Sequence, residues 1–130
     1  MRFGYVIFEE RPAVVAEKDS DGWRLLDIAH DLFDVLLGEW AAIEAAYKRG
    51  QVVPAENLRF LAPIPRPGKI VAIGQNYMDH VREQNVAPPE KPIIFAKFPS
   101  TVCGPNAIVE WSPALTSAVD YEAELAVVIG

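Results

Sequence analysis

Residues 120–130 constrain this chain most, because they place carboxylates at alternate positions in an otherwise apolar run. Side chains alternate between the two faces of a strand, so Asp120, Glu122 and Glu124 are predicted to share one face. Carboxylates that are desolvated close together repel each other and become protonated unless a cation lies between them. A hard divalent ion with oxygen ligands is the simplest such cation. The segment therefore suggests a metal site on a strand.

A half-exposed antiparallel strand explains the same pattern, with its acids in water and its apolar face on a core. On pattern alone this solvated strand is the commoner case. Against it stands the second half of the segment, residues 125–129, which is apolar on both faces. Both interpretations stay open at this point.

Composition narrows the class of protein. Of 130 residues, 51% are apolar and 23% charged, which is the balance of a globular chain with a real core. The net charge of −6, without clustered Lys and Arg, argues against a nucleic-acid surface and favours a small ligand or a protein partner. Cys103 is the only cysteine, so neither an intrachain disulfide nor a cysteine-based zinc site is expected. We find neither a membrane-spanning run nor a signal peptide, and expect a cytoplasmic protein with no membrane partner.

The first 62 residues are predicted to form a small N-terminal α/β domain. Residues 3–8, 13–16 and 23–26 have the composition of short strands separated by turns, which indicates an antiparallel meander. Residues 36–49 have helical periodicity and end at Gly50, and residues 31–37 are expected to form a separate helical turn.

Three prolines within residues 63–67 indicate an extended linker, and we place the domain boundary between residues 62 and 63. Beyond the linker we expect a buried strand at 69–74, a short helix at 76–84 that begins with Asn76 as its N-cap, and a strand at 93–97. The acidic segment is expected to add a further strand.

His80 and Glu83 lie three residues apart on the expected helix and would face the same side. A carboxylate that holds an imidazole raises its basicity, which makes the pair a candidate general base; a solvated surface pair has the same spacing. Lys97 ends an apolar run, so it is either an anion-binding residue or an exposed strand terminus. Gly74 would let the backbone approach a ligand closely or turn sharply, but the glycine spacing of a dinucleotide-binding site is absent.

Three blocks in this order, KIVAIGQNYMDH at 69–80, PIIFAK at 92–97 and VDYEAELAVVIG at 119–130, resemble signature blocks of the fumarylacetoacetate hydrolase family. The resemblance implies a mostly β, α+β fold, in which the N-terminal meander with its helix is followed by the start of a mixed β-roll over residues 63–130. Members of the family are about twice as long as this chain. We therefore expect the chain to be an N-terminal portion of such an enzyme, which lacks a third acidic metal ligand and is inactive alone.

The resemblance also implies a Mg²⁺- or Mn²⁺-dependent enzyme that cleaves a carbon–carbon bond in a 2,4-dioxo acid, and a homodimer at full length. Alternatives are an isomerase or decarboxylase of a small oxo acid, or a non-catalytic binding domain. Asp120 is expected beside the metal ligands and not among them. The implied site residues are Glu122 and Glu124 as metal ligands, His80, Glu83 and Lys97 as catalytic residues, and Gln75, Asn76 and Tyr77 as substrate-binding residues.

Overall fold

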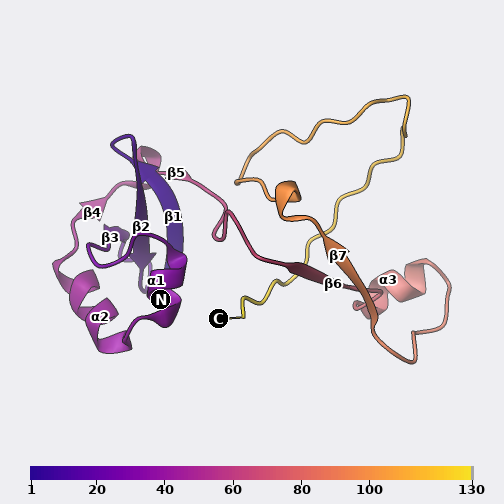
Figure 1. Cartoon of the computed structure of the whole chain (residues 1–130), viewed down its shortest axis with the longest axis horizontal. Helices are drawn as coiled ribbons and strands as arrows, with labels where there is room; N and C mark the ends of the chain where they lie inside the picture. The colour runs from indigo at the N-terminus through magenta and orange to yellow at the C-terminus, as the bar shows by residue number, and fades with distance from the viewer. Residues whose placement is uncertain (130) are drawn as a thin grey trace. The chain divides into compact units, whose positions relative to one another are not determined.

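The computed structural model describes residues 1–129. Its contacts divide the chain into an N-terminal unit, Met1–Ile64 with Gly104–Gly130, and a central unit, Pro65–Cys103. Figure 1 shows the helices and strands of each unit. The domain limits predicted above, 1–62 and 63–130, stay a prediction.

The N-terminal unit is built on one antiparallel sheet of order β4-β3-β2-β1-β5. The predicted meander is confirmed in its first three strands. The last two strands were not predicted, because two residues are too few to show a period of two. The strands are β1 (Arg2–Phe8), β2 (Arg11–Glu17), β3 (Trp23–Leu25), β4 (Val52–Val53) and β5 (Arg59–Phe60).

A two-residue turn joins β1 to β2. Phe8 pairs with Arg11, and the residues between them, Glu9 and Glu10, have φ of 47° and 61°. Two successive left-handed residues are typical of the type I′ turn, whose twist matches that of the flanking strands. The turn therefore sets the register of the hairpin despite the absence of glycine.

The helix predicted at residues 36–49 is wrong in its beginning, because two helices occupy this region: α1 (Leu32–Leu37) and α2 (Trp40–Arg49). Asp31 caps α1, since its Oδ1 accepts hydrogen bonds from the backbone N–H of Phe33 at 2.8 Å and of Asp34 at 3.1 Å. Gly38 then takes an extended conformation that ends α1. The separate helical turn expected at residues 31–37 is confirmed.

Both faces of the sheet carry a core, because successive residues of β2 point to opposite sides. Val14 and Ala16 pack with the helices, whereas Val15 packs on the other face. The buried residues of the helix-side core are Val14, Ala16, Leu26, Leu32, Val35, Ile43, Ala46 and Tyr47. Those of the opposite core are Val6, Val15, Val53 and Leu58.

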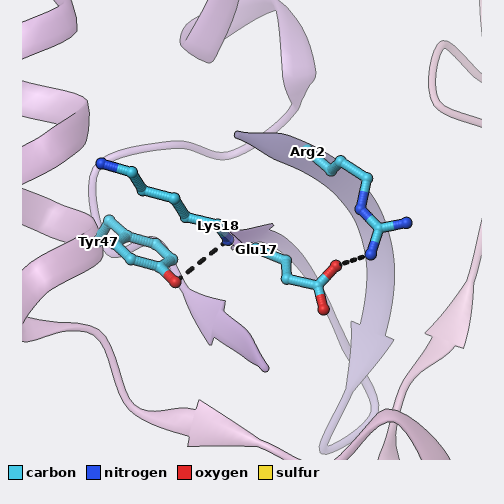
Figure 2. Close-up of polar contacts among 4 residues, drawn as sticks. All are labelled: Arg2, Glu17, Lys18 and Tyr47. Atoms are coloured by element: carbon cyan, nitrogen blue, oxygen red, sulfur yellow. Dashed lines mark hydrogen bonds and ion pairs between the residues drawn. The ribbon is translucent and has the colours of Figure 1, made fainter. Parts of the chain in front are cut away.

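Tyr47 ties α2 to the end of β2. Its hydroxyl accepts a hydrogen bond from the backbone N–H of Lys18 at 3.2 Å, and the neighbouring Glu17 forms an ion pair with Arg2 of β1 (Figure 2). The guanidinium of Arg24 lies 5.3 Å from the centre of the Tyr47 ring, within the range of a cation–π contact. A ring that is buried and hydrogen-bonded in this way fixes how the helix lies on the sheet.

The central unit contains an antiparallel pair, β6 (Ile70–Gly74) and β7 (Ile93–Lys97), joined through α3 (Met78–Glu83). Both strands confirm the prediction. The helix is shorter than predicted, and its N-cap residue is Tyr77, not Asn76. The side chain of Tyr77 makes no capping hydrogen bond. The remaining short elements are the 3₁₀ turns η1 (Ala55–Asn57) and η2 (Pro99–Thr101).

Residues 102–129 contain neither a helix nor a strand, so the strand predicted at residues 120–130 is wrong for the part that the structure describes. A strand requires a hydrogen-bonded neighbour, and no segment within residues 1–129 pairs with this one. Its apolar face is not buried either, since Tyr121 is 92% and Leu125 84% exposed. Gly130 lies outside the described residues. The mixed β-roll stays a prediction.

Candidate functional site

The central unit has a hollow of about 250 Å³ where β6 ends, which we call the β6 hollow. One side is formed by the chain between β6 and α3, and the other by the proline-rich loop before β7. Its lining residues are Ile73, Gly74, Gln75, Asn76, Met78 and residues 88–92. Two of the three predicted substrate-binding residues, Gln75 and Asn76, thus line one hollow. Their role in binding stays a prediction.

Gln75 has an uncommon backbone conformation, with φ of +51°. This left-handed region suits Gly, Asn and Asp, and costs other residues roughly 1–2 kcal/mol. Strained residues are frequent at binding and catalytic sites. The conformation turns the chain sharply from the strand into the short segment that precedes α3.

His80 lies on α3 and is half-buried. Its ring Nε2 lies 2.6 Å from the side-chain Nε2 of Gln84, whose Oε1 accepts a hydrogen bond from Nε2 of Gln75 at 3.0 Å. The imidazole is therefore linked through two amides to a residue that lines the β6 hollow. Gln84 was not predicted from the sequence, although its spacing of four residues from His80 places both side chains on one helix face.

Glu83 ends α3 and is exposed. It is three residues from His80, as predicted, and the His80 ring contacts Gln84. The His80–Glu83 dyad stays a prediction. Tyr77, the third predicted substrate-binding residue, lies at the start of the helix and is 40% exposed.

Lys97 lies at the opposite end of the strand pair from the β6 hollow. It pairs with Ile70, whereas Gly74, next to the hollow, pairs with Ile93. Four residues of strand separate the two ends, or about 14 Å at the usual rise. The lysine that lines the hollow is Lys91, which the sequence did not single out. The structure thus brings Gln75, His80 and Gln84 together and places Lys97 elsewhere, and the catalytic role of Lys97 stays a prediction.

Glu122 and Glu124 lie on the exposed C-terminal segment of the N-terminal unit. Carboxylate oxygens are the donors that Mg²⁺ and Mn²⁺ prefer, but such ions need about six ligands, of which this pair supplies only a part. No group of three or more His, Cys, Asp or Glu residues that could hold a metal ion occurs within residues 1–129. The described residues do not make a complete metal centre.

None of the helices in residues 1–129 is both long enough and apolar enough to cross a membrane.

The second half of the chain is similar to known proteins. Residues 69–130 match the family model described as "Fumarylacetoacetate (FAA) hydrolase C-terminal". The chain is 53% identical over 81 residues to "Oxaloacetate tautomerase FAHD2A, mitochondrial" of Bos taurus and 52% identical over 79 residues to the protein of the same name of Homo sapiens. Each match covers 61% of this chain and 25% of the relative, so the chain spans about a quarter of the length of these relatives.

A relative from Dictyostelium discoideum, "Fumarylacetoacetate hydrolase domain-containing protein 2 homolog", is 49% identical over 79 residues, or 60% of this chain and 25% of the relative. The fold resembles that of a putative HpcE protein from Mycobacterium smegmatis, with a TM-score of 0.59 and 24% identity, over 85% of this chain and 41% of that one. The cytoplasmic location expected above stays a prediction, since two of these relatives have "mitochondrial" in their names. Residues 69–130 are thus similar to the fumarylacetoacetate hydrolase family, as the sequence motifs indicated.

Proposed function

We propose that the protein is an enzyme that interconverts the keto and enol forms of a small oxo acid. The observation that carries this proposal is the imidazole of His80, linked through the amide of Gln84 to Gln75 at the β6 hollow. The names of the relatives support the same reaction, since two of them are called oxaloacetate tautomerases.

The reaction needs a group that carries one proton. In the keto form, a C–H bond lies next to the carbonyl carbon; a base removes this proton, and the electron pair of the bond moves to give an enolate. Protonation of the enolate oxygen completes the enol, with no net gain or loss of electrons. Histidine suits this task, because it takes up and releases protons near neutral pH.

The substrate class follows from the polar groups at the hollow. An oxo acid presents a carboxylate beside a carbonyl, and both groups accept hydrogen bonds. Asn76 and Lys91 both line the hollow, and their amide and ammonium groups donate hydrogen bonds. We propose that they bind a carboxylate of the substrate.

We retain Glu122 and Glu124 as proposed ligands of Mg²⁺ or Mn²⁺, on the family resemblance of their segment. A bound divalent ion polarises a carbonyl as a Lewis acid. The described residues do not complete its ligand set, so the proton transfer above is derived from His80 alone.

Hydrolysis of a carbon–carbon bond in a 2,4-dioxo acid is the second candidate, since the matched family model is described as a hydrolase. In that reaction His80 would remove a proton from water, and the hydroxide would attack the carbonyl farther from the carboxylate. The bond between that carbonyl carbon and the carbon that separates the two carbonyls would break. This leaves a carboxylic acid and an enolate, which takes up a proton.

Product analysis separates the two reactions. The purified full-length protein is incubated with Mg²⁺ and either oxaloacetate or an acylpyruvate, and the products are followed by proton NMR. Faster keto–enol exchange of oxaloacetate without cleavage products supports the tautomerase; cleavage of the acylpyruvate supports the hydrolase. Absence of both activities contradicts an enzyme of this kind.

The histidine is tested in the same assay. His80→Ala is expected to lower the rate by roughly a hundredfold or more, the usual contribution of a general acid–base group. The only other histidine, His30, is exposed and lies in the N-terminal unit, so His30→Ala is the matched control and should retain the full rate. A His80→Ala variant as active as the control would exclude His80 as the proton carrier.

A further inference from the structure

The end of α3 holds Gln84 in a defined position. Gln84 is the C-cap residue, in right-handed helical conformation, and its backbone N–H donates to the carbonyl of His80 at 3.1 Å. The next residue, Asn85, is left-handed with φ of +53° and donates to Arg82 at 3.0 Å, while Val86 donates to Val81 at 3.3 Å. These two hydrogen bonds and the left-handed residue form a Schellman motif.

The motif fixes which side chain accompanies His80. Gln84 is four residues after His80, so both side chains lie on the same face of the helix. A helix that unwound before Gln84 would take its side chain away from this face. Because the backbone is fixed on both sides of Gln84, its amide stays within reach of the ring.

Gln75 orients this amide from the other side. Its Nε2 donates to Oε1 of Gln84, so the nitrogen of the Gln84 amide faces the imidazole. A primary amide nitrogen is only a donor, and the Nε2 atom of His80 must therefore accept. In a neutral imidazole one nitrogen accepts and the other carries the proton, which assigns the proton to Nδ1.

We propose that Gln84, oriented by Gln75, is a positioning residue that aligns the imidazole of His80 and holds it in the Nδ1–H tautomer. The left-handed backbone of Gln75 has a use in this arrangement, because it turns the chain between β6 and α3 where its side chain meets Gln84. The orientation and the tautomer rest on the geometry of the central unit alone. Only their consequence for the rate rests on the proposed function.

The tautomer is measured directly. In the ¹⁵N-labelled protein, long-range ¹H–¹⁵N NMR correlations show which ring nitrogen of His80 carries the proton at a pH where the ring is neutral. We expect Nδ1–H in the natural protein. Gln84→Leu removes the donor, and the ring should move toward Nε2–H; Gln84→Glu offers only acceptors and should produce Nε2–H outright. His30 is the internal control, and its signals should not change.

The variants are expected to fold, because Gln84 is exposed and its backbone hydrogen bonds do not need its side chain. Gln75→Gly provides a second route to the same result: it keeps the left-handed backbone and removes the amide that orients Gln84. In this variant the His80 ring should no longer be held as the Nδ1–H tautomer alone.

Steady-state kinetics of Gln84→Leu test the effect of Gln84 on catalysis. Loss of a partner that orients a metal-ligating histidine costs on the order of tenfold to a hundredfold; taking the lower end of this range, we expect Gln84→Leu to lower kcat by about tenfold, with KM little changed. An Nε2–H ring in the natural protein, or an unchanged tautomer in Gln84→Leu, overturns the positioning role whatever the activity. If His80→Ala is fully active while Gln84→Leu shifts the tautomer, the proposed function fails and the positioning of the ring stands.

Discussion

Arg49 donates two hydrogen bonds to the carboxylate of Asp27, from Nε to Oδ2 at 3.1 Å and from Nη2 to Oδ1 at 2.8 Å. The pair joins the last residue of α2 to the chain that follows β3. These hydrogen bonds and the positive charge of Arg49 hold the pKa of Asp27 below its ordinary value of 3.8.

The lowered pKa predicts how the stability from this pair depends on pH. A carboxyl whose pKa is lower in the folded state stabilises the fold above its unfolded-state pKa, and this stabilisation is lost as the pH falls through the folded-state pKa. Asp27→Asn should therefore melt at a lower temperature than the natural protein at pH 7, and the difference should shrink as the pH falls below 3.8. Thermal unfolding between pH 7 and pH 2 measures this. Asp19→Asn, in an exposed turn, is the control, and an equal shift in both variants would contradict the prediction.

The core beneath α2 should tolerate little loss of volume. Ile43 is 2% exposed and belongs to the helix-side core, so Ile43→Ala should lower the free energy of unfolding by about 2–5 kcal/mol. Leu37→Ala is the matched control: Leu37 is 76% exposed, and a surface change of this kind usually stays within about 0.5 kcal/mol. Urea unfolding of the two variants compares them, and equal losses would mean that α2 does not pack as described.

The hydroxyl of Tyr47 can be tested without disturbing the ring. Tyr47→Phe keeps the buried aromatic surface and removes the acceptor of the Lys18 backbone N–H (Figure 2). We expect a loss of about 1 kcal/mol, the usual net contribution of one hydrogen bond. Amide hydrogen exchange at Lys18 should become faster in the variant. An unchanged exchange rate at this amide would exclude the hydrogen bond.

The predicted metal ligands can be tested by binding alone. In the full-length protein, Glu122→Gln and Glu124→Gln each remove one negative charge and should weaken Mg²⁺ or Mn²⁺ binding by at least about tenfold. Isothermal titration calorimetry measures the affinity. Glu110→Gln, in the same exposed segment, is the matched control and should bind as the natural protein does. Equal affinities in all three variants would exclude the two glutamates as ligands.

The sequence predicted those elements whose residues repeat with a clear period. The strands β1, β2, β6 and β7 each extend over at least five residues, enough for a run of strand-forming side chains to be recognised. It missed β4 and β5, which have two residues each and exist only because neighbouring strands supply their hydrogen bonds. The separate helical turn at residues 31–37 was predicted, but the start of the next helix was placed at residue 36 instead of Trp40, since one glycine inside a helical pattern does not by itself end a helix.

The family resemblance that the sequence suggested is confirmed, because motifs in a fixed order identify a family whatever their surroundings. The candidate site depended on more than the order of residues. His80 was predicted from its spacing to Glu83. Only the tertiary structure showed that Gln84 contacts His80, and that Gln75, nine residues before Gln84, reaches the Gln84 amide through the turn between β6 and α3. The sequence by itself thus determined the types of the longer elements and the family resemblance, which depend on local spacing. The tertiary structure decided which side chains meet, because contacts between distant residues depend on where each turn directs the chain.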